Sequence, residues 1–275
     1  MFDFFGGKLR SLQFFLFFFF SVIVSSVAYC ESESVSPELV NSEPVQSVPI
    51  KSEYLIKAWR KSHFALDKAG SLIPEQRNGQ AFYKVREGRY EFQRSLSKDK
   101  TALVVMDPWE DTGSPKMNKH YKRVFSQRLV PLVKHAIAMG LKVVVITNDP
   151  KTINLGYAAR INPNLQVLVD VGKVDVLYHS DMDDRKFEAY LKLAGIDTLI
   201  YSGFASNMCV IGMPTGMIPM FHRGFRLFFV PEASAATEYG NTWGSGTVHK
   251  SMTSMISQWV GEIIAFKDFM KIKPI

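Results

Sequence analysis

The chain has 275 residues, of which 47% are hydrophobic and 21% charged, and it carries a formal net charge of +7. This composition is ordinary for a globular protein and allows one sizeable buried core. Two cysteines cannot build a disulfide framework. The basic residues are scattered without a repeating aromatic platform, so the charge indicates a solvated surface and argues against nucleic-acid binding.

Residues 1–28 have the layout of a signal peptide. Lys8 and Arg10 precede the 17-residue apolar run "LQFFLFFFFSVIVSSVA". Ser26 and Ala28 supply the small residues that a signal peptidase requires, which predicts cleavage after Ala28. We therefore expect an exported protein, periplasmic or extracellular. The alternative is an uncleaved leader that anchors the chain in a membrane.

The next two segments precede the regular part of the chain. Residues 29–52 are rich in Ser, Glu and Pro without an apolar period, which predicts a flexible linker. Residues 53–100 form an N-terminal extension, in which we expect a short helix over 53–70 and a strand or arm over 81–93. The sequence assigns this extension no function.

From residue 101 to the C-terminus the pattern becomes regular. Short apolar runs alternate with longer segments, several of helical period: "ALVVM", "KVVVI", "DVLY", "DTLIYS" and "RLFFV". This alternation predicts an α/β fold, a doubly wound and mostly parallel sheet flanked by helices. Residues 117–140 should form the first crossover helix, and residues 248–269 the last helix.

Ligands of open parallel sheets bind at the carboxyl ends of the strands, so we expect chemistry in the residues that follow each apolar run. Those residues are Asp107, Asn148, Asp149, His179 and the stretch "GFASNMC", residues 203–209.

Asp107 and Cys209 should meet at this edge in an arrangement for nucleophilic catalysis. Cys209 opens a predicted helix, where backbone amides are expected to lower the pKa of its thiol, and Asp107 can accept the thiol proton. The amides of Ala205 and Cys209 can hold the oxyanion of a tetrahedral intermediate. Taken alone, the pattern also fits a buried structural cysteine and an aspartate that caps the next helix.

Four segments, taken in order, resemble the isochorismatase-like cysteine hydrolase family: "ALVVMDPWED", "KVVVITNDP", "LKLAGIDTLIYSGFASNMCV" and "HRGFRLFFVPEASA". The likeness covers about residues 100–265, and its most specific motif is "GFASNMCV". The segment "CVIGMPTGMIPMFHRGF" further resembles a secreted, poorly characterised branch. The family contains nicotinamidases, carbamoyl-amide hydrolases and isochorismatases, and its fold is a doubly wound sheet.

The resemblance implies a catalytic triad of Asp, Lys and Cys, in which Asp107 and Cys209 match the first and last members. The sequence departs from the family pattern at the lysine, because the run "DVLY" is followed by His179. Lys173 precedes that strand, and Lys186 lies beyond it in a helix. His179 stands at the right end of the strand to act as a cationic partner or proton carrier, and we include it among the catalytic residues.

Nicotinamidases of the family carry a metal on an aspartate and paired histidines, and the matching segment "TNDPKTINLG" has no histidine. His120 and His135 lie too far apart on one helix to replace them. We therefore expect no metal and no organic cofactor. Trp109 and Phe204 are the predicted substrate-pocket residues, and the glycine-rich stretch 238–250 is expected either to cover the site or only to cap the last helix.

The sequence thus predicts an exported hydrolase that cleaves a C–N bond, amide or carbamoyl, of a small molecule through an acyl-enzyme on Cys209. The alternative is a binding protein that kept the fold and lost activity with the lysine. A nucleotide-dependent Rossmann enzyme is disfavoured because no Gly-x-Gly-x-x-Gly follows a predicted strand. The resemblance also suggests self-association, whereas the identity of the substrate stays open.

Overall fold

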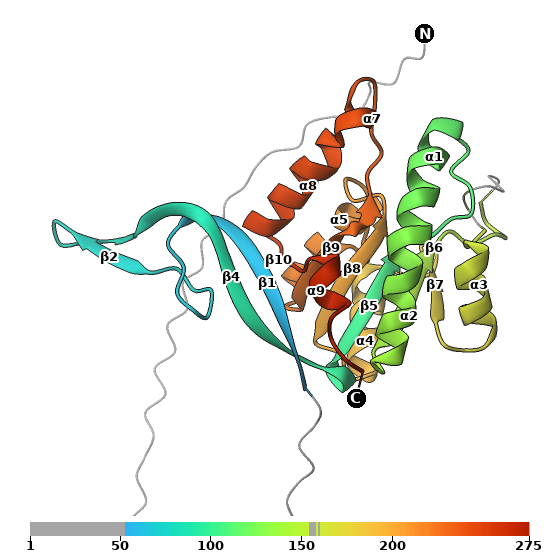
Figure 1. Cartoon of the computed structure of the whole chain (residues 1–275). Coiled ribbons are helices and arrows are strands. Elements are labelled where there is room, and N and C mark those ends of the chain that lie inside the picture. Colours follow the sequence, from blue (N-terminus) through green and yellow to red (C-terminus); the bar gives the residue numbers. More distant parts are fainter. Residues whose placement is uncertain (1–52, 154–157, 159, 275) are drawn as a thin grey trace, which may run out of the picture. The chain divides into compact units, whose positions relative to one another are not determined.

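The computed structural model describes residues 53–153, 158 and 160–274 (Figure 1). The predicted leader, linker and cleavage site lie outside the described residues. Among the residues that are described, no helix has the length and apolarity needed to cross a membrane.

The centre of the fold is an eight-stranded sheet with the strand order β4-β1-β10-β9-β8-β5-β6-β7. The six strands from β10 to β7 pair in parallel, whereas β1 pairs antiparallel with both β10 and β4. A separate two-stranded ladder joins β2 and β3. The strands are β1 (Glu53–Phe64), β2 (Pro74–Arg77), β3 (Gln80–Tyr83), β4 (Val85–Ser97), β5 (Thr101–Met106), β6 (Lys142–Thr147), β7 (Asp175–Tyr178), β8 (Thr198–Phe204), β9 (Arg226–Ala235) and β10 (Glu262–Ile263).

Helices cover both faces of the sheet, which confirms the predicted doubly wound, mostly parallel fold. Along β5, Leu103 and Val105 face one buried cluster, while Val104 and Met106 face the other. The first cluster includes side chains of α1, α2, α3 and α9, and the second includes those of α4, α5, α6 and α8. The helices are α1 (Pro115–Val124), α2 (Val130–Ala138), α3 (Pro163–Asp170), α4 (Asp184–Leu193), α5 (Cys209–Gly212), α6 (Met217–His222), α7 (Thr242–Ser245), α8 (Thr247–Gln258) and α9 (Phe266–Phe269).

The first crossover helix forms where the apolar period predicts it. It starts with a Ser114 hydroxyl cap on the Met117 amide and with Pro115 at the first helical position. One π-helical turn, Phe125–Leu129, joins α1 to α2, so the helical path is continuous from Pro115 to Ala138. Its buried side chains include Tyr121, which becomes important at the site below.

Two expected helices are corrected by the structure. Residues 53–64 form β1 and not a helix, and their alternation of exposed and buried positions is that of a strand with one face on the core. The last helix ends at Gln258, earlier than expected, and Glu262–Ile263 pairs with β9 as β10. Gly261 allows this turn, because a Cβ at that position would lie 2.8 Å from the Leu227 carbonyl oxygen.

The N-terminal extension is a long β-hairpin that joins the central sheet. The inner parts of β1 and β4 place Tyr54, Ile56 and Leu96 in the core, whereas the outer part extends to the β2–β3 ladder (Figure 1, blue to teal). The 3₁₀ turn Lys98–Lys100 then leads into β5.

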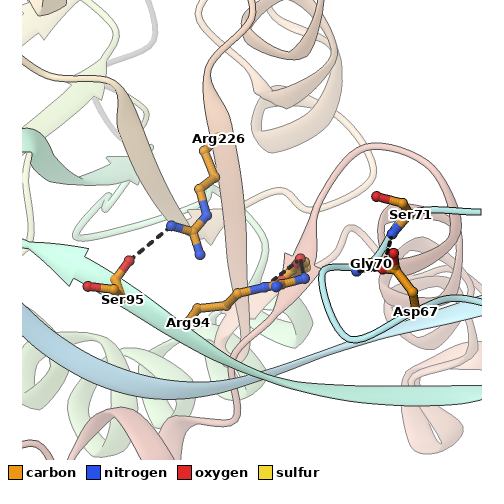
Figure 2. A network of polar contacts seen from close by, with 7 residues as sticks. Asp67, Gly70, Ser71, Arg94, Ser95 and Arg226 are labelled. Carbon is orange, nitrogen blue, oxygen red and sulfur yellow. Dashed lines mark hydrogen bonds and ion pairs between the residues drawn. The ribbon is translucent and has the colours of Figure 1, made fainter.

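A polar network fastens the hairpin to the rest of the sheet (Figure 2). The Arg94 guanidinium donates to both carboxylate oxygens of Glu262 on β10, at 2.7 to 3.1 Å. Arg226 of β9 donates to the Ser95 carbonyl oxygen at 2.9 Å. Nearby, Asp67 accepts the amides of Gly70 and Ser71 and so closes the loop that lies beside Arg94.

Candidate active site

Asp107 follows β5 directly and its backbone is fixed on both sides. Its amide continues the ladder by donating to the Ile146 carbonyl at 2.8 Å. Its carbonyl accepts the Tyr121 hydroxyl at 2.6 Å and the Trp109 amide at 2.8 Å. Asp107 has φ of +43°, a left-handed conformation that is uncommon outside glycine and is found at active sites. These contacts hold a fully buried carboxylate at the end of a central strand.

Tyr121 is a site residue whose role the sequence did not reveal. Its ring was expected to be one of several apolar positions on the first helix, but its hydroxyl also supports Asp107. Burial first, and then the Asp107 charge, raise the pKa of this hydroxyl far above its usual value. Tyr121 therefore stays a neutral hydrogen-bond donor.

His179 follows β7 and reaches the same carboxylate. Its amide donates to the Thr147 carbonyl at 2.9 Å, which extends the pairing of β6 and β7 by one residue. Its Nε2 atom lies 3.0 Å from Asp107 Oδ1, and because a carboxylate accepts, Nε2–H is the donor. The His179 side chain is 9% exposed.

Cys209 approaches Asp107 from β8. Gly203, near the end of β8, has φ of +111°, and a Cβ there would lie only 2.1 Å from the Met106 carbonyl oxygen. Glycine therefore allows β8 to pass very close to the end of β5. A cis peptide bond joins Phe204 to Ala205, and the chain then turns into α5, whose first residue is Cys209.

The turn before Cys209 is held by each of its polar side chains. Asn207 accepts the Thr237 amide at 3.0 Å and donates to the Thr237 carbonyl at 3.3 Å. The Ser206 hydroxyl lies 2.9 Å from His249 Nδ1 on α8, while His249 Nε2–H donates to the Pro231 carbonyl at 3.0 Å. The sequence motif indicated the turn, but nothing in it identified Thr237 or His249 as partners.

A carboxylate oxygen of Asp107, a ring nitrogen of His179 and the Cys209 sulfur lie within 4.8 Å of one another. The structure thus brings together the three residues that were predicted to be catalytic. Asp107 Oδ2 is buried and has no hydrogen-bond partner among the described residues. It is accordingly the carboxylate oxygen that is free to receive a proton.

The pKa of the Cys209 thiol is shifted opposite to our expectation. Burial raises it most, and the negative charge of Asp107 raises it further, while the amides of Ala205 and Cys209 lower it by a smaller amount. The short helix and its amides therefore do not outweigh the apolar surroundings. The resting site holds a neutral thiol beside a carboxylate.

Neither candidate lysine reaches this site. Lys173 is exposed and precedes β7, at the end of the strand opposite to His179. Lys186 lies in the first turn of α4, where its Nζ donates to the Asp181 carbonyl at 3.2 Å. Of the three residues considered for the third position, His179 is the one that contacts Asp107.

The remaining polar residues at the strand ends have structural partners. Asn148 donates to the Ala158 carbonyl at 2.9 Å, and Asp149 accepts the Lys151 amide at 2.9 Å within a turn. The nicotinamidase type of metal site does not fit here, because no histidine occurs between His135 and His179. Asp107, His179 and Cys209 are residue types that suit a metal, but Nε2 of His179 is engaged with Asp107 Oδ1. We therefore describe the set as a hydrogen-bonded His179–Asp107 pair with the Cys209 thiol beside it.

The two predicted pocket residues lie side by side. Phe204 is buried and packs edge-on against the rings of Trp109 and Tyr121, with centroid separations of 5.7 and 5.1 Å. Trp109 is partly exposed, and its indole N–H donates to Thr147 Oγ1 at 3.0 Å. Their contact with a substrate stays a prediction.

No curated protein matches this chain. Among solved structures, a cysteine hydrolase from Pseudomonas syringae pv. phaseolicola 1448A is 17% identical over 64% of this chain and 93% of its own, with a TM-score of 0.47. The YcaC gene product of Escherichia coli, described as an octameric hydrolase of unknown specificity, is 16% identical over 64% and 79%, with a TM-score of 0.48. The nicotinamidase/pyrazinamidase PncA of Bacillus subtilis is 18% identical over 60% and 99%, with a TM-score of 0.47.

At this level of similarity, the substrate and the oligomeric state of these proteins cannot be assigned to this chain. The family comparison is stronger. The model of the isochorismatase domain matches residues 101–257, more than half of the chain and every strand from β5 to β9. The chain therefore belongs to the isochorismatase-like hydrolase family.

Proposed function

We propose that this protein is a cysteine hydrolase that cleaves a C–N bond, amide or carbamoyl, of a small molecule. The observation that carries the proposal is the juxtaposition of the Cys209 thiol with a buried carboxylate whose Oδ2 has no partner within the described residues. A neutral thiol needs a nearby base, and an unpartnered carboxylate oxygen is suited to that role.

The first half of the reaction forms an acyl-enzyme. The Cys209 sulfur attacks the substrate carbonyl carbon while Asp107 takes the thiol proton. The amides of Ala205 and Cys209, which lower the pKa of the thiol, donate to the oxyanion of the tetrahedral intermediate. As the C–N bond breaks, Asp107 returns the proton to the leaving nitrogen, and the acyl group remains on sulfur as a thioester.

The second half consumes one water molecule. Asp107 accepts a proton from this water as its oxygen attacks the thioester carbon, and the same two amides hold the second oxyanion. The C–S bond then breaks, the acid is released, and the proton returns from Asp107 to the sulfur. The thiol and the carboxylate are thereby restored without an organic cofactor.

His179 replaces the ammonium group of the family pattern. Its Nε2–H donates to Asp107 Oδ1 at 3.0 Å, which fixes the carboxylate and leaves Oδ2 without a partner among the described residues. This role resembles that of a group which orients a catalytic base. The imidazole supplies one hydrogen bond where an ammonium would supply several, so Asp107 depends on the Tyr121 and Ile146 contacts for the rest of its position.

A panel of small amides and carbamoyl compounds tests this function, with release of the amine or ammonia measured for the full chain and for Cys209→Ala. We expect turnover of at least one compound and a loss of about 10⁴-fold or more in the variant, because the residual rate would come only from the oxyanion donors and binding. A wild-type chain that binds these compounds without turning them over would favour the inactive binding protein. Turnover that survives the substitution would exclude Cys209 as the nucleophile.

A further inference from the structure

One face of α1 carries three basic side chains that line a cavity. Lys116, Lys119 and Arg123 are spaced three and four residues apart, so they project from the same side of the helix. Together with His120 of α1 and with Trp243 and Gly244 of α7, they line a cavity of about 430 Å³. No acidic residue lines this cavity.

The three charges have no partner in the described part of the chain. None of these side chains forms an ion pair or a side-chain hydrogen bond there, whereas Arg94, Lys142 and Arg223 are each paired with acidic groups. Like charges at this spacing destabilise a helix by roughly 0.2–0.5 kcal/mol per pair. Lys116 also lies in the first turn, where the helix dipole disfavours a cation and where α1 has no acidic residue. The fold gains no ion pair from this arrangement.

An aromatic ring stands opposite the charges. The Lys116 ammonium lies 5.6 Å from the centroid of the Trp243 ring, at a distance typical of a cation–π contact. Trp243 is partly exposed, and an indole of this kind can pack against a planar ligand.

His120 connects this cavity to a second one. It also lines a larger cavity of about 600 Å³, whose walls combine the apolar side chains of Trp59, Val124 and Pro231 with the charged side chains of Lys61, Glu232 and Lys250. Burial, and then the Arg123 charge, lower the pKa of His120, so the imidazole adds no charge at neutral pH. The basic cavity and the larger cavity of mixed lining are thus separated by a neutral side chain.

We propose that these adjoining cavities bind a small organic oxyanion, a phosphate or carboxylate group carried on an aromatic body. The oxyanion is held by Lys116, Lys119 and Arg123, which supply charge-assisted hydrogen bonds. The aromatic body packs against Trp243 and extends along His120 into the larger cavity. This site is separate from Asp107, His179 and Cys209, none of which lines either cavity.

The larger cavity also places the ligand close to the catalytic turn. His249 is one of its lining residues and accepts the Ser206 hydroxyl, directly beside Ala205. A ligand that fills this cavity therefore lies one hydrogen bond away from the turn that precedes Cys209.

The test is a calorimetric titration of the full chain with phenyl phosphate, benzoate, inorganic phosphate and uncharged benzyl alcohol at one ionic strength of about 0.15 M, which screens charges at long range. We expect saturable binding of phenyl phosphate or benzoate, at least about tenfold tighter than that of inorganic phosphate or benzyl alcohol, because charge and ring both contribute. The tighter of the two aromatic oxyanions identifies the head group.

Two double variants make the test specific. Lys119→Gln/Arg123→Gln removes two charges from the cavity and should weaken binding by about tenfold or more. Lys122→Gln/Lys134→Gln removes two exposed charges from the same helical segment outside the cavity and should leave binding unchanged. Trp243→Ala should abolish the preference for the aromatic compounds. Cys209→Ala should bind like the wild type, even if the chain proves to have no hydrolase activity.

Three results would overturn the proposal. They are the absence of saturable binding by either aromatic oxyanion, an equal loss in both double variants, and a loss in Cys209→Ala. The second result would mean a general charge effect, and the third would place the ligand at the catalytic thiol. Circular dichroism of each variant checks that the substitutions leave the fold intact.

Discussion

The carboxyl edge of the parallel strands and the outer part of the N-terminal hairpin differ in how deeply their residues are buried. At the edge, Asp107 is buried and fixed through its amide, its carbonyl and Tyr121. In the hairpin, β3 is exposed along its whole length, and Phe82 and Tyr83 stand about half in solvent. The carboxyl edge is therefore tightly packed, whereas the outer part of the hairpin is largely exposed to solvent. The same kind of substitution should therefore have very different effects in the two regions.

A glycine-to-alanine exchange in each region gives the largest contrast. Gly203→Ala would place a Cβ 2.1 Å from the Met106 carbonyl oxygen at φ of +111°, so we expect a loss of more than about 4 kcal/mol or no folded protein. Gly79→Ala lies in the β2–β3 turn at φ of +77°, where a Cβ would meet nothing within 4 Å, and should cost about 1–2 kcal/mol from backbone strain alone. Urea unfolding measures both, and equal losses would contradict the comparison.

Asp107→Asn should come next in size. The amide keeps the shape of the side chain but cannot take the thiol proton, so we expect kcat to fall by about 10³-fold, within the range of general-base catalysis. The substitution also removes the negative charge that raises the thiol pKa, so that pKa should fall.

The pH profile of alkylation checks this shift. In the wild type the raised pKa keeps Cys209 protonated, so iodoacetamide should react slowly at neutral pH and faster as pH rises. In Asp107→Asn the same rise should occur at lower pH. The rate is followed by mass spectrometry on the peptide that contains Cys209, which separates it from Cys30. Identical profiles would mean that the carboxylate does not act on the sulfur.

His179→Ala should have a smaller effect on catalysis than Asp107→Asn. It removes the hydrogen bond to Asp107 Oδ1 and leaves the base in place, so we expect kcat to fall by about 10- to 100-fold with KM little changed. His179→Lys, which introduces the residue of the family pattern, should retain more activity than His179→Ala. Wild-type kcat in the alanine variant would remove His179 from the site.

The hairpin provides the smallest expected effect and a matched control. Arg94→Met leaves Glu262, whose side chain is 15% exposed, without its bidentate partner, and should cost about 2–3 kcal/mol of unfolding free energy. Arg77→Met breaks an exposed pair with Glu75 at the outer end of the hairpin and should cost less than about 1 kcal/mol. Both variants should keep the wild-type kcat. A large loss of kcat in either would couple the hairpin to the site.

The regions also differ in how well the sequence predicts them. The continuous apolar run of β5 predicts a buried parallel strand, and the polar residue after it is then placed by the geometry of the sheet. This rule located Asp107, His179 and the Cys209 turn. It could not supply Tyr121 or His249, because both are side chains of distant helices that reach the site only through tertiary packing.

The prediction of a helix over residues 53–70 was wrong for a local reason. The alternation of β1 is interrupted in the sequence by Leu55, an apolar residue that is 72% exposed in the structure. The prediction of a lowered thiol pKa for Cys209 was wrong for another reason. The sequence indicates that backbone amides near Cys209 lower the pKa of its thiol. Burial raises this pKa by more, and the depth of burial depends on the whole fold.

The most direct test of the central claim is mass spectrometry of the full chain stopped during turnover of an amide or carbamoyl substrate from the panel. We predict a mass increase equal to the acyl group, located on the peptide that contains Cys209 and missing from Cys209→Ala. Turnover in which the acyl group is found on another residue, or in which Cys209→Ala matches the wild-type rate, would contradict the account.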